Sequence, residues 1–361
     1  MRIAFYAPMK PPDHPVPSGD RLMARQLMQA MCLAGYTVFL ASKFRSHAPA
    51  IEDFSLRRAE GEAEAARVAS EWRAAPAPEP DLFFCYHTYF KAPDYLGPAL
   101  SEAFDIPYVT AEASYTPSRD RGPWAEVQAV VRRGLDRAAL NICFTERDRE
   151  GLIDLVGDAR LAMLPPFIDT SPFDAEAACA RTPRLVTVAM MRPGDKLDSY
   201  RLLAEALALC GDIPWELAIV GDGPCRDEVL ELFSAIDPAR IEWQGEKRPE
   251  EIPAILAGGD VYVWPGFGEA FGLAYLEAQA AGLPVVAMAT AGVPEVVRKG
   301  ETGLLTPQGD AAAYGGAIRV LLGDASRRRT LGAAARRFVL EERSLEKAAA
   351  TLKVLLSRFE P

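Results

Sequence analysis

Residues 266–286 have the sequence GFGEAFGLAYLEAQAAGLPVV, which decides the fold of the C-terminal half. The apolar run DVYVWP (260–265) precedes this stretch, and a second apolar run, PVVAM, spans 284–288. Both runs are short and rich in β-branched or aromatic residues, which predicts buried strands, and FGLAYLEAQAA between them predicts a helix that ends at Gly282. Strand, helix and strand together make one βαβ unit of a parallel sheet.

The same alternation runs through the rest of the chain. Strand-like runs from RIAFYA to AMLP alternate with helical patterns near 19–34, 93–104, 122–138 and 145–156, and a second set extends from RLVTVAM to GLLTP. For 361 residues this predicts an α/β fold of two Rossmann-like, doubly wound parallel-sheet domains that face a central crevice. The predicted domains are 1–167 and 183–342, joined by a proline-containing linker at 168–182.

Composition excludes several classes of partner. The formal net charge of -10 argues against nucleic acid, since phosphate backbones bind basic surfaces. No apolar run is long enough to span a membrane, the apolar start is too short for a signal peptide, and the cysteines form no CxxC pair. We therefore expect a cytoplasmic protein. The three histidines lack ligand spacing and no DxD occurs, so we expect no metal site.

Two glutamates stand out in the opening stretch, because an unpartnered buried charge costs several kcal/mol. Glu269 falls in the predicted loop and Glu277 about two helical turns further on, roughly 12 Å along the axis. Between them lie the free N–H groups around Phe271, Gly272 and Leu273, which form an anion site. This predicts a nucleotide-activated sugar, with its ribose at Glu277, its diphosphate at the amides and its transferred sugar at Glu269. The alternative is that Glu269 only complements the helix dipole and Glu277 faces solvent.

Two cations follow another predicted strand, RLVTVAM (184–190). Arg192 and Lys196 fall in the loop at its carboxyl end, ahead of a helix expected to begin near Leu197. Two cations at such an edge suit an anionic ligand such as a diphosphate. For either residue alone, an ordinary solvated charge is the simpler interpretation.

Three further strand ends carry candidate residues. Gly221 opens GDGP, which lacks the third glycine of a dinucleotide fingerprint and predicts a tight turn with Pro224 at the first helical position. Gly292 precedes another helix and either presents amides to the sugar or phosphate, or makes a plain turn. His87 follows DLFFCY in the N-terminal half and either contacts substrate near Lys91 or has no chemical role.

Taken together, these motifs resemble retaining glycosyltransferases of family 4, which have the GT-B fold. The resemblance rests on EAFGLAYLE, which matches the E-x7-E motif at Glu269 and Glu277, on GLPVVA, AGVPEVV, GETGLL and GDGP, and on the loop with Arg192 and Lys196. In the N-terminal half the resemblance rests only on the general sequence pattern of residues 6–31. The resemblance implies a donor site in the C-terminal domain, an acceptor site on the N-terminal domain, and a final helix (343–361) that packs back onto the N-terminal domain.

The sequence also departs from the family pattern. Many members have two adjacent glycines in the first loop, where only Gly19 stands here. Members often carry a histidine after the strand that here reads PYVTAEASY, where Glu112 and Ser114 stand instead. Arg192 and Lys196 are also closer together than is usual. Gly19, His87 and Glu112 are therefore the candidates for the acceptor or sugar side of the site.

The sequence thus predicts a retaining hexosyltransferase that uses a nucleotide-diphosphate sugar and needs no cofactor or metal. Arg192, Lys196 and the helix start would stabilise the leaving phosphate. The acceptor is open between a glycan, a lipid-linked molecule and a small molecule. Alternatives are a nucleotide-sugar epimerase or hydrolase on the same scaffold, or a non-catalytic nucleotide-sugar-binding protein. Peripheral contact with the inner membrane surface, through Arg57, Arg58 or residues 119–137, stays open.

Overall fold

The computed structural model describes residues 1–75, 79–173 and 182–360, which form two compact units. Unit 1 comprises residues 1–165 and 345–361, and unit 2 comprises residues 166–344. Of the predicted linker, residues 168–173 pack within unit 2, where the Ile168 amide donates to the Arg343 carbonyl at 2.9 Å. Residues 174–181 of that linker lie outside the described residues. The crevice between the domains stays a prediction.

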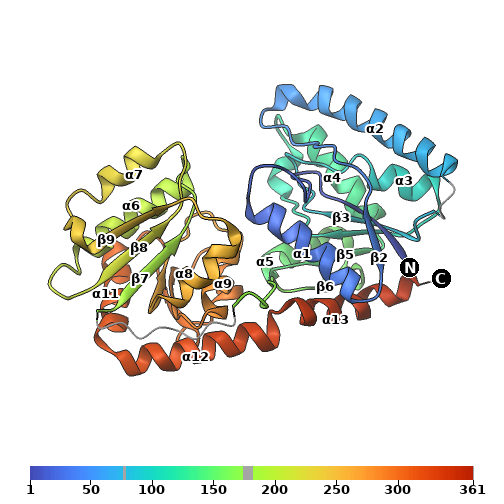
Figure 1. Cartoon of the computed structure of the whole chain (residues 1–361). Helices are drawn as coiled ribbons and strands as arrows, with labels where there is room; N and C mark the ends of the chain where they lie inside the picture. The colour runs from blue at the N-terminus through green and yellow to red at the C-terminus, as the bar shows by residue number, and fades with distance from the viewer. Residues whose placement is uncertain (76–78, 174–181, 361) are drawn as a thin grey trace. The chain divides into compact units, whose positions relative to one another are not determined.

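Unit 1 contains a six-stranded parallel sheet with the order β2-β1-β3-β4-β5-β6 (Figure 1). Its strands are β1 (Arg2–Tyr6), β2 (Thr37–Leu40), β3 (Leu82–Tyr86), β4 (Tyr108–Ala111), β5 (Leu140–Cys143) and β6 (Leu161–Met163). Its helices are α1 (Gly19–Leu33), α2 (Phe54–Ala74), α3 (Gly97–Ala103), α4 (Ala125–Arg137), α5 (Glu146–Val156) and α13 (Leu345–Leu356). Short 3-10 turns occupy Ile51–Asp53, Pro117–Asp120, Asp158–Arg160 and Ser357–Phe359.

The last helix of the chain, α13, belongs to unit 1 and packs along α1 (Figure 1). Leu352 and Leu356 are fully buried there, as are Leu27 and Met31 on α1. Beyond α13, Glu360 accepts a hydrogen bond from the Tyr36 hydroxyl at 2.9 Å. Apolar burial and this bond hold the end of the chain at the amino end of β2.

Unit 2 contains a second six-stranded parallel sheet, with the order β12-β11-β10-β7-β8-β9. Its strands are β7 (Arg184–Val188), β8 (Glu216–Val220), β9 (Ile241–Gly245), β10 (Val261–Val263), β11 (Val285–Met288) and β12 (Gly303–Thr306). Its helices are α6 (Asp195–Ala208), α7 (Arg226–Leu232), α8 (Ile252–Ala257), α9 (Leu273–Ala280), α10 (Val293–Val296), α11 (Ala311–Gly323) and α12 (Ala325–Glu342). The 3-10 turns of this unit are Pro238–Arg240 and Pro249–Glu251.

Each sheet has one point at which its strand order reverses. In unit 1 the chain passes from β1 to β2 on one side and then to β3 on the other side, and in unit 2 the neighbouring strands β7 and β10 mark the same reversal. At such a point the loops that leave the carboxyl ends of the two strands diverge, and ligands of doubly wound sheets bind between them. The fold therefore marks one candidate site in each unit.

The predicted fold class, two doubly wound parallel sheets of the GT-B type, is confirmed. Residues 260–288 form β10, α9 and β11, as their pattern predicts. Within the described ranges, we find no helix with the length and apolarity needed to cross a bilayer. The cytoplasmic location and the peripheral membrane contact stay predictions.

Candidate functional site

The reversal point of unit 2 brings together the two loops that carry the predicted cations and the first glutamate. The loop after β7 contains Arg192 and leads into α6, while the loop after β10 contains Glu269 and leads into α9. The side chains of Lys196 and Glu269 are 28% and 17% exposed, so solvent reaches the site.

Glu269 is held by two side chains from different elements. Lys196 Nζ forms an ion pair with Glu269 Oε1, and Trp264 Nε1 donates to the same oxygen at 3.1 Å. Lys196 also lies over the Trp264 ring, with its Nζ 5.4 Å from the ring centroid. Lys196 lies in the first turn of α6, which begins at Asp195, so the predicted helix start near Leu197 was two residues late.

The loop before α9 is fixed against α6. The Phe267 amide donates to Ser199 Oγ at 3.0 Å. Gly268 has a φ of 62°, which favours glycine, and a Cβ at this position would lie 2.0 Å from Asp195 Oδ2. A bulkier residue would strain the loop and force the Asp195 side chain to move.

Helix α9 presents its N-terminal end at this site. Its first N–H groups have no carbonyl partner within the helix, and Gly272 is its N-cap residue. The side chains of Phe271 and Leu273 are buried, so neither side chain is presented to a ligand. At the other end of α9, Arg336 donates to the Ala280 carbonyl, which complements the helix dipole.

Glu277 lies on α9 about one turn past its start, closer to the N-terminus than the two turns predicted. Its side chain is partly buried and has no hydrogen-bond partner among the described residues. Burial raises the pKa of Glu277 to about 7, because the charged carboxylate has lost much of its water. A ligand hydroxyl would supply the missing partner, and the side chain does not extend freely into solvent.

Arg192 is partly buried, and its side chain makes no ion pair or hydrogen bond within the described part of the chain. The GDGP loop packs directly on the backbone beside it, since the Met191 amide donates to the Asp222 carbonyl at 2.9 Å. A Cβ on Gly221 would lie 1.9 Å from the Ala189 carbonyl oxygen, so this approach requires glycine. Helix α7 begins only at Arg226, so the prediction that Pro224 would occupy its first turn was wrong.

Gly292 lies at the carboxyl end of the next strand, β11. It is the N-cap residue of α10, a helix of only four residues. The Met288 amide donates to the Pro265 carbonyl at 3.0 Å, which joins this loop region to the one that carries Glu269. Gly292 is thus near the same edge of the sheet, and its predicted contact with the sugar or phosphate stays a prediction.

The reversal point of unit 1 carries a second charged pair, Asp20 and His87. His87 follows β3 directly and donates from Nδ1 to Asp20 Oδ1, in the first turn of α1, at 3.0 Å. Burial opposes the imidazolium charge, but Glu112 and Asp20 outweigh it and raise the pKa of His87 to about 9. His87 is therefore a hydrogen-bond donor at neutral pH and not a base.

Glu112 lies behind His87 at the end of the neighbouring strand, β4. It is 8% exposed, and its Oε2 has no hydrogen-bond partner among the described residues. Burial raises the pKa of Glu112 to about 7, against the opposing charge of His87. His87 and Glu112 both have positive φ angles, 61° and 52°, which side-chain-bearing residues rarely adopt and which occur often at functional sites.

Sequence reasoning missed the acidic partners in unit 1. Asp20 follows the predicted Gly19, which opens α1, and a side chain at Gly19 would meet no atom within 4 Å. Asp148 caps α5 together with Thr145, and its charge acts on His87. An acid in the first turn of a helix that follows a strand is the signal that would have found both. Among the described residues, no group of three or more His, Cys, Asp or Glu side chains could hold a metal ion.

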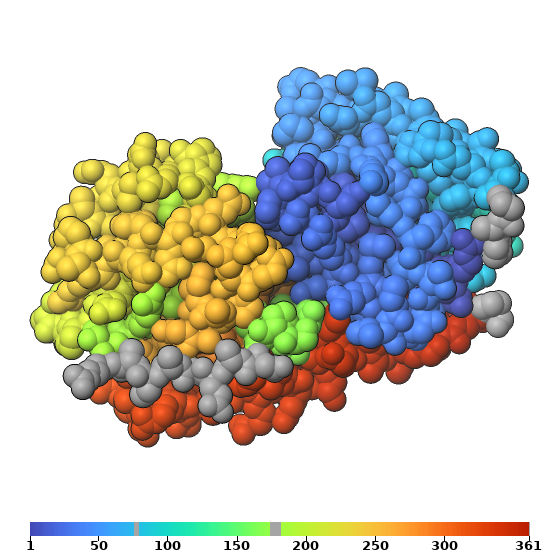
Figure 2. Space-filling view, in the orientation of Figure 1, coloured from blue at the N-terminus to red at the C-terminus, as the bar shows by residue number. Residues whose placement is uncertain are grey.

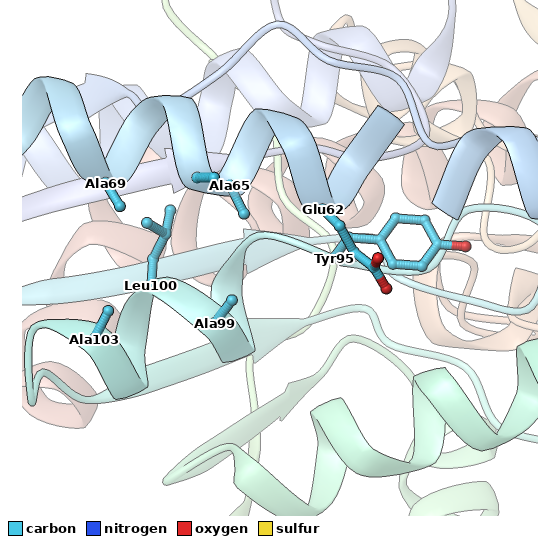
Figure 3. Close-up of a pocket in the computed structure, with 8 residues that line it drawn as sticks. Glu62, Ala65, Ala69, Tyr95, Ala99, Leu100 and Ala103 are labelled. Carbon is cyan, nitrogen blue, oxygen red and sulfur yellow. The ribbon is translucent and has the colours of Figure 1, made fainter. Parts of the chain in front are cut away.

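A pocket of about 290 Å³ lies elsewhere in unit 1, between α2 and α3 (Figure 3). Ala65 and Ala69 of α2 face Ala99 and Ala103 of α3 across it. None of the predicted site residues lines this pocket. Its alanine walls offer no charged group apart from Glu62, so it lacks the chemistry of the two reversal points.

Comparison with known proteins finds a family match in the C-terminal half of the chain. Residues 182–324 match the family model of glycosyl transferases group 1. Sulfoquinovosyl transferase SQD2 of Arabidopsis thaliana is 35% identical over 141 residues, which cover 38% of this chain and 26% of that protein. The GDP-mannose-dependent alpha-(1-6)-phosphatidylinositol monomannoside mannosyltransferase of Mycolicibacterium smegmatis is 33% identical over 216 residues, which cover 55% of this chain and 56% of that protein.

Solved structures share the fold over nearly the whole chain. Sucrose-phosphate synthase from Thermosynechococcus elongatus superimposes with a TM-score of 0.76 at 20% identity, covering 99% of this chain and 98% of that one. Anabaena HepE in complex with UDP-glucose superimposes with a TM-score of 0.74 at 18% identity, covering 99% and 100%. Residues 182–324 therefore match the group 1 glycosyl transferases, in agreement with the predicted resemblance to family 4, and the chain shares its fold with the solved structures. The chain spans about a quarter to just over half of the length of the first curated relatives.

Proposed function

We propose that the protein is a retaining hexosyltransferase that moves a sugar from a nucleoside-diphosphate donor to an acceptor hydroxyl. One observation carries the proposal: Lys196 and Glu269 meet at the reversal point of unit 2, beside the start of α9. The cations and the helix-end amides suit the diphosphate of a nucleotide sugar, and the carboxylates on either side of the amides suit its hydroxyl groups.

The donor would lie across the start of α9. Glu277, which lacks a partner among the described residues, would accept hydrogen bonds from the ribose hydroxyls. The backbone amides at Gly272 and Leu273 would bind the diphosphate, and Glu269 would bind hydroxyls of the transferred sugar. Gly221 lets the GDGP loop approach the end of β7, just before Arg192. This contact would hold Arg192 on the same side of the sheet as the start of α9.

The chemical step requires charge stabilisation more than a protein base. The bond between the anomeric carbon and the diphosphate oxygen breaks, a bond to the acceptor oxygen forms on the same face, and the acceptor proton passes to the departing phosphate. Negative charge on the leaving oxygens grows through this step, so Arg192 and Lys196 stabilise the transition state more than the ground state. Glu269 would keep Lys196 oriented through their ion pair.

We also propose that the reaction proceeds without a metal, because Arg192, Lys196 and the start of α9 would supply the positive charge that a bound ion supplies elsewhere. Excess EDTA should leave the rate of transfer unchanged. Loss of activity that Mg²⁺ or Mn²⁺ restores would contradict this part of the proposal.

The nucleotide and the acceptor are open to direct tests. Among the similar proteins, HepE has been solved with UDP-glucose and the mycobacterial mannosyltransferase is GDP-mannose-dependent, so UDP- and GDP-sugars are the first donors to test. We propose that the acceptor hydroxyl binds at the reversal point of unit 1. There the His87 imidazolium can donate a hydrogen bond, and Asp20 can accept one from a hydroxyl group.

The test is to incubate the protein with UDP-, GDP- and ADP-sugars, with and without candidate acceptors, and to identify all products. A glycoside with retained anomeric configuration, together with a nucleoside diphosphate, is the expected result. Free sugar as the sole product would indicate a hydrolase, and an altered nucleotide sugar would indicate an epimerase. Binding without turnover for every acceptor would indicate a non-catalytic binding protein.

A further inference from the structure

A second polar surface lies in unit 1, beside the pair formed by Asp20 and His87. We call it the basic cluster, and it consists of Arg45 and His47 in the loop after β2 and Lys91 in the loop after β3. All three side chains are partly buried. Since β2, β1 and β3 are neighbours in a parallel sheet, these loops leave the same edge of the sheet.

Hydrogen bonds to backbone carbonyls hold the loops of the basic cluster in place. The Ala48 amide donates to the Lys91 carbonyl at 2.8 Å, which places His47 beside the loop after β3. Arg45 Nε donates to the Met9 carbonyl at 3.0 Å, so the loop after β1 lies against the same group. The blue atoms of the first sixty residues form much of the visible surface of unit 1 (Figure 2).

No carboxylate among the described residues forms an ion pair with the basic cluster. Arg45 donates to the neutral Met9 carbonyl, and Lys91 Nζ lies 5.8 Å from the centroid of the Phe90 ring. By contrast, Lys43 in the same loop forms an ion pair with Asp13. Like charges gathered without a counter-charge raise the energy of the free protein, and a bound anion relieves that repulsion.

The ionisation of His47 is consistent with this arrangement. Burial lowers the pKa of His47, and the charges of Arg45, Lys91 and Arg57 lower it further. Arg57, in the first turn of α2, is already paired with Glu60 at 2.8 Å. Asp20 is the carboxylate that opposes the shift, and it is itself bonded to His87.

We propose that Arg45, His47 and Lys91 bind a phosphate group carried by the acceptor. Arginine, imidazole and lysine side chains all donate hydrogen bonds to phosphate oxygens. This inference rests on the proposed function, because it places the acceptor hydroxyl at Asp20 and His87 and the phosphate of the same molecule at the basic cluster. The phosphate belongs either to a lipid headgroup or to a water-soluble molecule, and the recognition chemistry is shared.

The experiment measures phosphate binding by the full chain after UDP has been added to saturation, which occupies the donor site of unit 2. One arm titrates inorganic phosphate by calorimetry, and a second measures sedimentation with phosphatidylcholine vesicles that contain or lack phosphatidylinositol. Lys91→Ala removes one cation of the basic cluster. Lys43→Ala is the matched control, since it removes a lysine of the adjacent loop whose charge Asp13 already balances.

We expect Lys91→Ala to weaken phosphate binding by about tenfold and Lys43→Ala to change it by less than twofold. Binding of both probes supports a phosphate site that accepts either source. Binding of inorganic phosphate alone supports a soluble acceptor. Binding of phosphatidylinositol vesicles alone supports a lipid acceptor. Failure of both probes to bind, or equal losses in the two variants, would overturn the inference. UDP binding to the wild type is measured separately, so failure of the proposed function is distinguishable from failure of the phosphate site.

Discussion

The two reversal points of this protein have the same topology and different electrostatics. In unit 2, Lys196 and Glu269 join the loops after β7 and β10, and in unit 1, His87 and Asp20 join the loops after β3 and β1. Each pair connects two neighbouring strands at the point where the chain changes direction. The cation in unit 2 is a lysine, while the cation in unit 1 is an imidazolium whose charge depends on the acids around it.

The surroundings explain what each site can bind. The pair in unit 2 lies beside a helix start and a loop that carries a second cation, Arg192, so that site can stabilise a diphosphate. The pair in unit 1 is influenced by the acids Glu112 and Asp148, so that site favours groups that donate hydrogen bonds, such as hydroxyls. Under the proposed function, one topology, used twice, would provide a site for the leaving group and a site for the nucleophile.

The largest expected effect is a loss of turnover on substitution of a cation in unit 2. Arg192→Ala should lower turnover by about 10²- to 10³-fold, because it removes charge stabilisation from the departing phosphate. Steady-state kinetics with the best donor measures it. Lys299→Ala, which removes an exposed lysine of the same unit, is the control. Wild-type rates in Arg192→Ala would contradict the role of the loop after β7.

A second variant tests whether the carboxylate of the pair acts on the sugar. Glu269→Gln keeps an oxygen for the Trp264 indole but removes the charge that holds Lys196. We expect turnover to fall by about 10²-fold, while the affinity for the nucleoside diphosphate changes by less than threefold. Equal losses in rate and affinity would show that Glu269 serves only to maintain the local structure.

Glu277 should show the opposite balance between affinity and rate. Glu277→Gln should weaken binding of the nucleoside diphosphate by about tenfold, because hydrogen bonds to a charged group are stronger than those to a neutral one. Isothermal titration calorimetry measures the affinity, and Gln is the matched variant because it keeps the size of the side chain. Unchanged affinity would place the ribose elsewhere.

The Glu277→Gln variant also tests the pKa of Glu277, through the pH dependence of the stability. The pKa of Glu277 is raised by burial to about 7, so the folded state binds its proton more tightly than the unfolded state does. The stability linked to that proton is present below pH 4.5, the ordinary value, and is lost as the pH rises to 7. Glu277→Gln should therefore gain thermal stability relative to the wild type at pH 8 and show no such gain at pH 4.

The smallest expected effect concerns His87 in unit 1. Glu112 and Asp20 together raise the pKa of His87 from 6.5 to about 9, although burial opposes the shift. Stability from this charge is complete below pH 6.5 and is lost as the pH rises through 9. The melting temperature of His87→Gln should therefore lack the part of the decline with rising pH that the loss of the His87 charge causes in the wild type. An identical decline in the wild type and the variant would show that His87 is neutral in the folded protein.

In unit 2 the local structure around the predicted residues could be predicted from the sequence, because strand, loop and helix follow one another within residues 260–288. Periodicity placed Glu269 in the loop and Glu277 on α9, although Glu277 lies about one turn into the helix and not two. The cations of the loop after β7 were found in the same way, as polar residues at a strand end. The Trp264 indole was missed, because a tryptophan inside an apolar strand gives no sign that its N–H faces a carboxylate.

The site in unit 1 could not be assembled from the sequence. Asp20 and His87 are 67 residues apart, and they meet only because β1 and β3 are neighbours in the sheet. Strand order is a property of the whole fold, and single-residue patterns do not contain it. Neither do they reveal that the buried carboxylate of Glu112 influences the charge of His87.

The most direct measurement is a crystal structure of the protein with UDP or GDP, whichever binds more tightly. The account predicts that the diphosphate lies at the amides of Gly272 and Leu273, within contact of Arg192 and Lys196, and that the ribose hydroxyls reach Glu277. A nucleotide bound away from the start of α9, or the absence of any nucleotide binding in solution, would contradict the account.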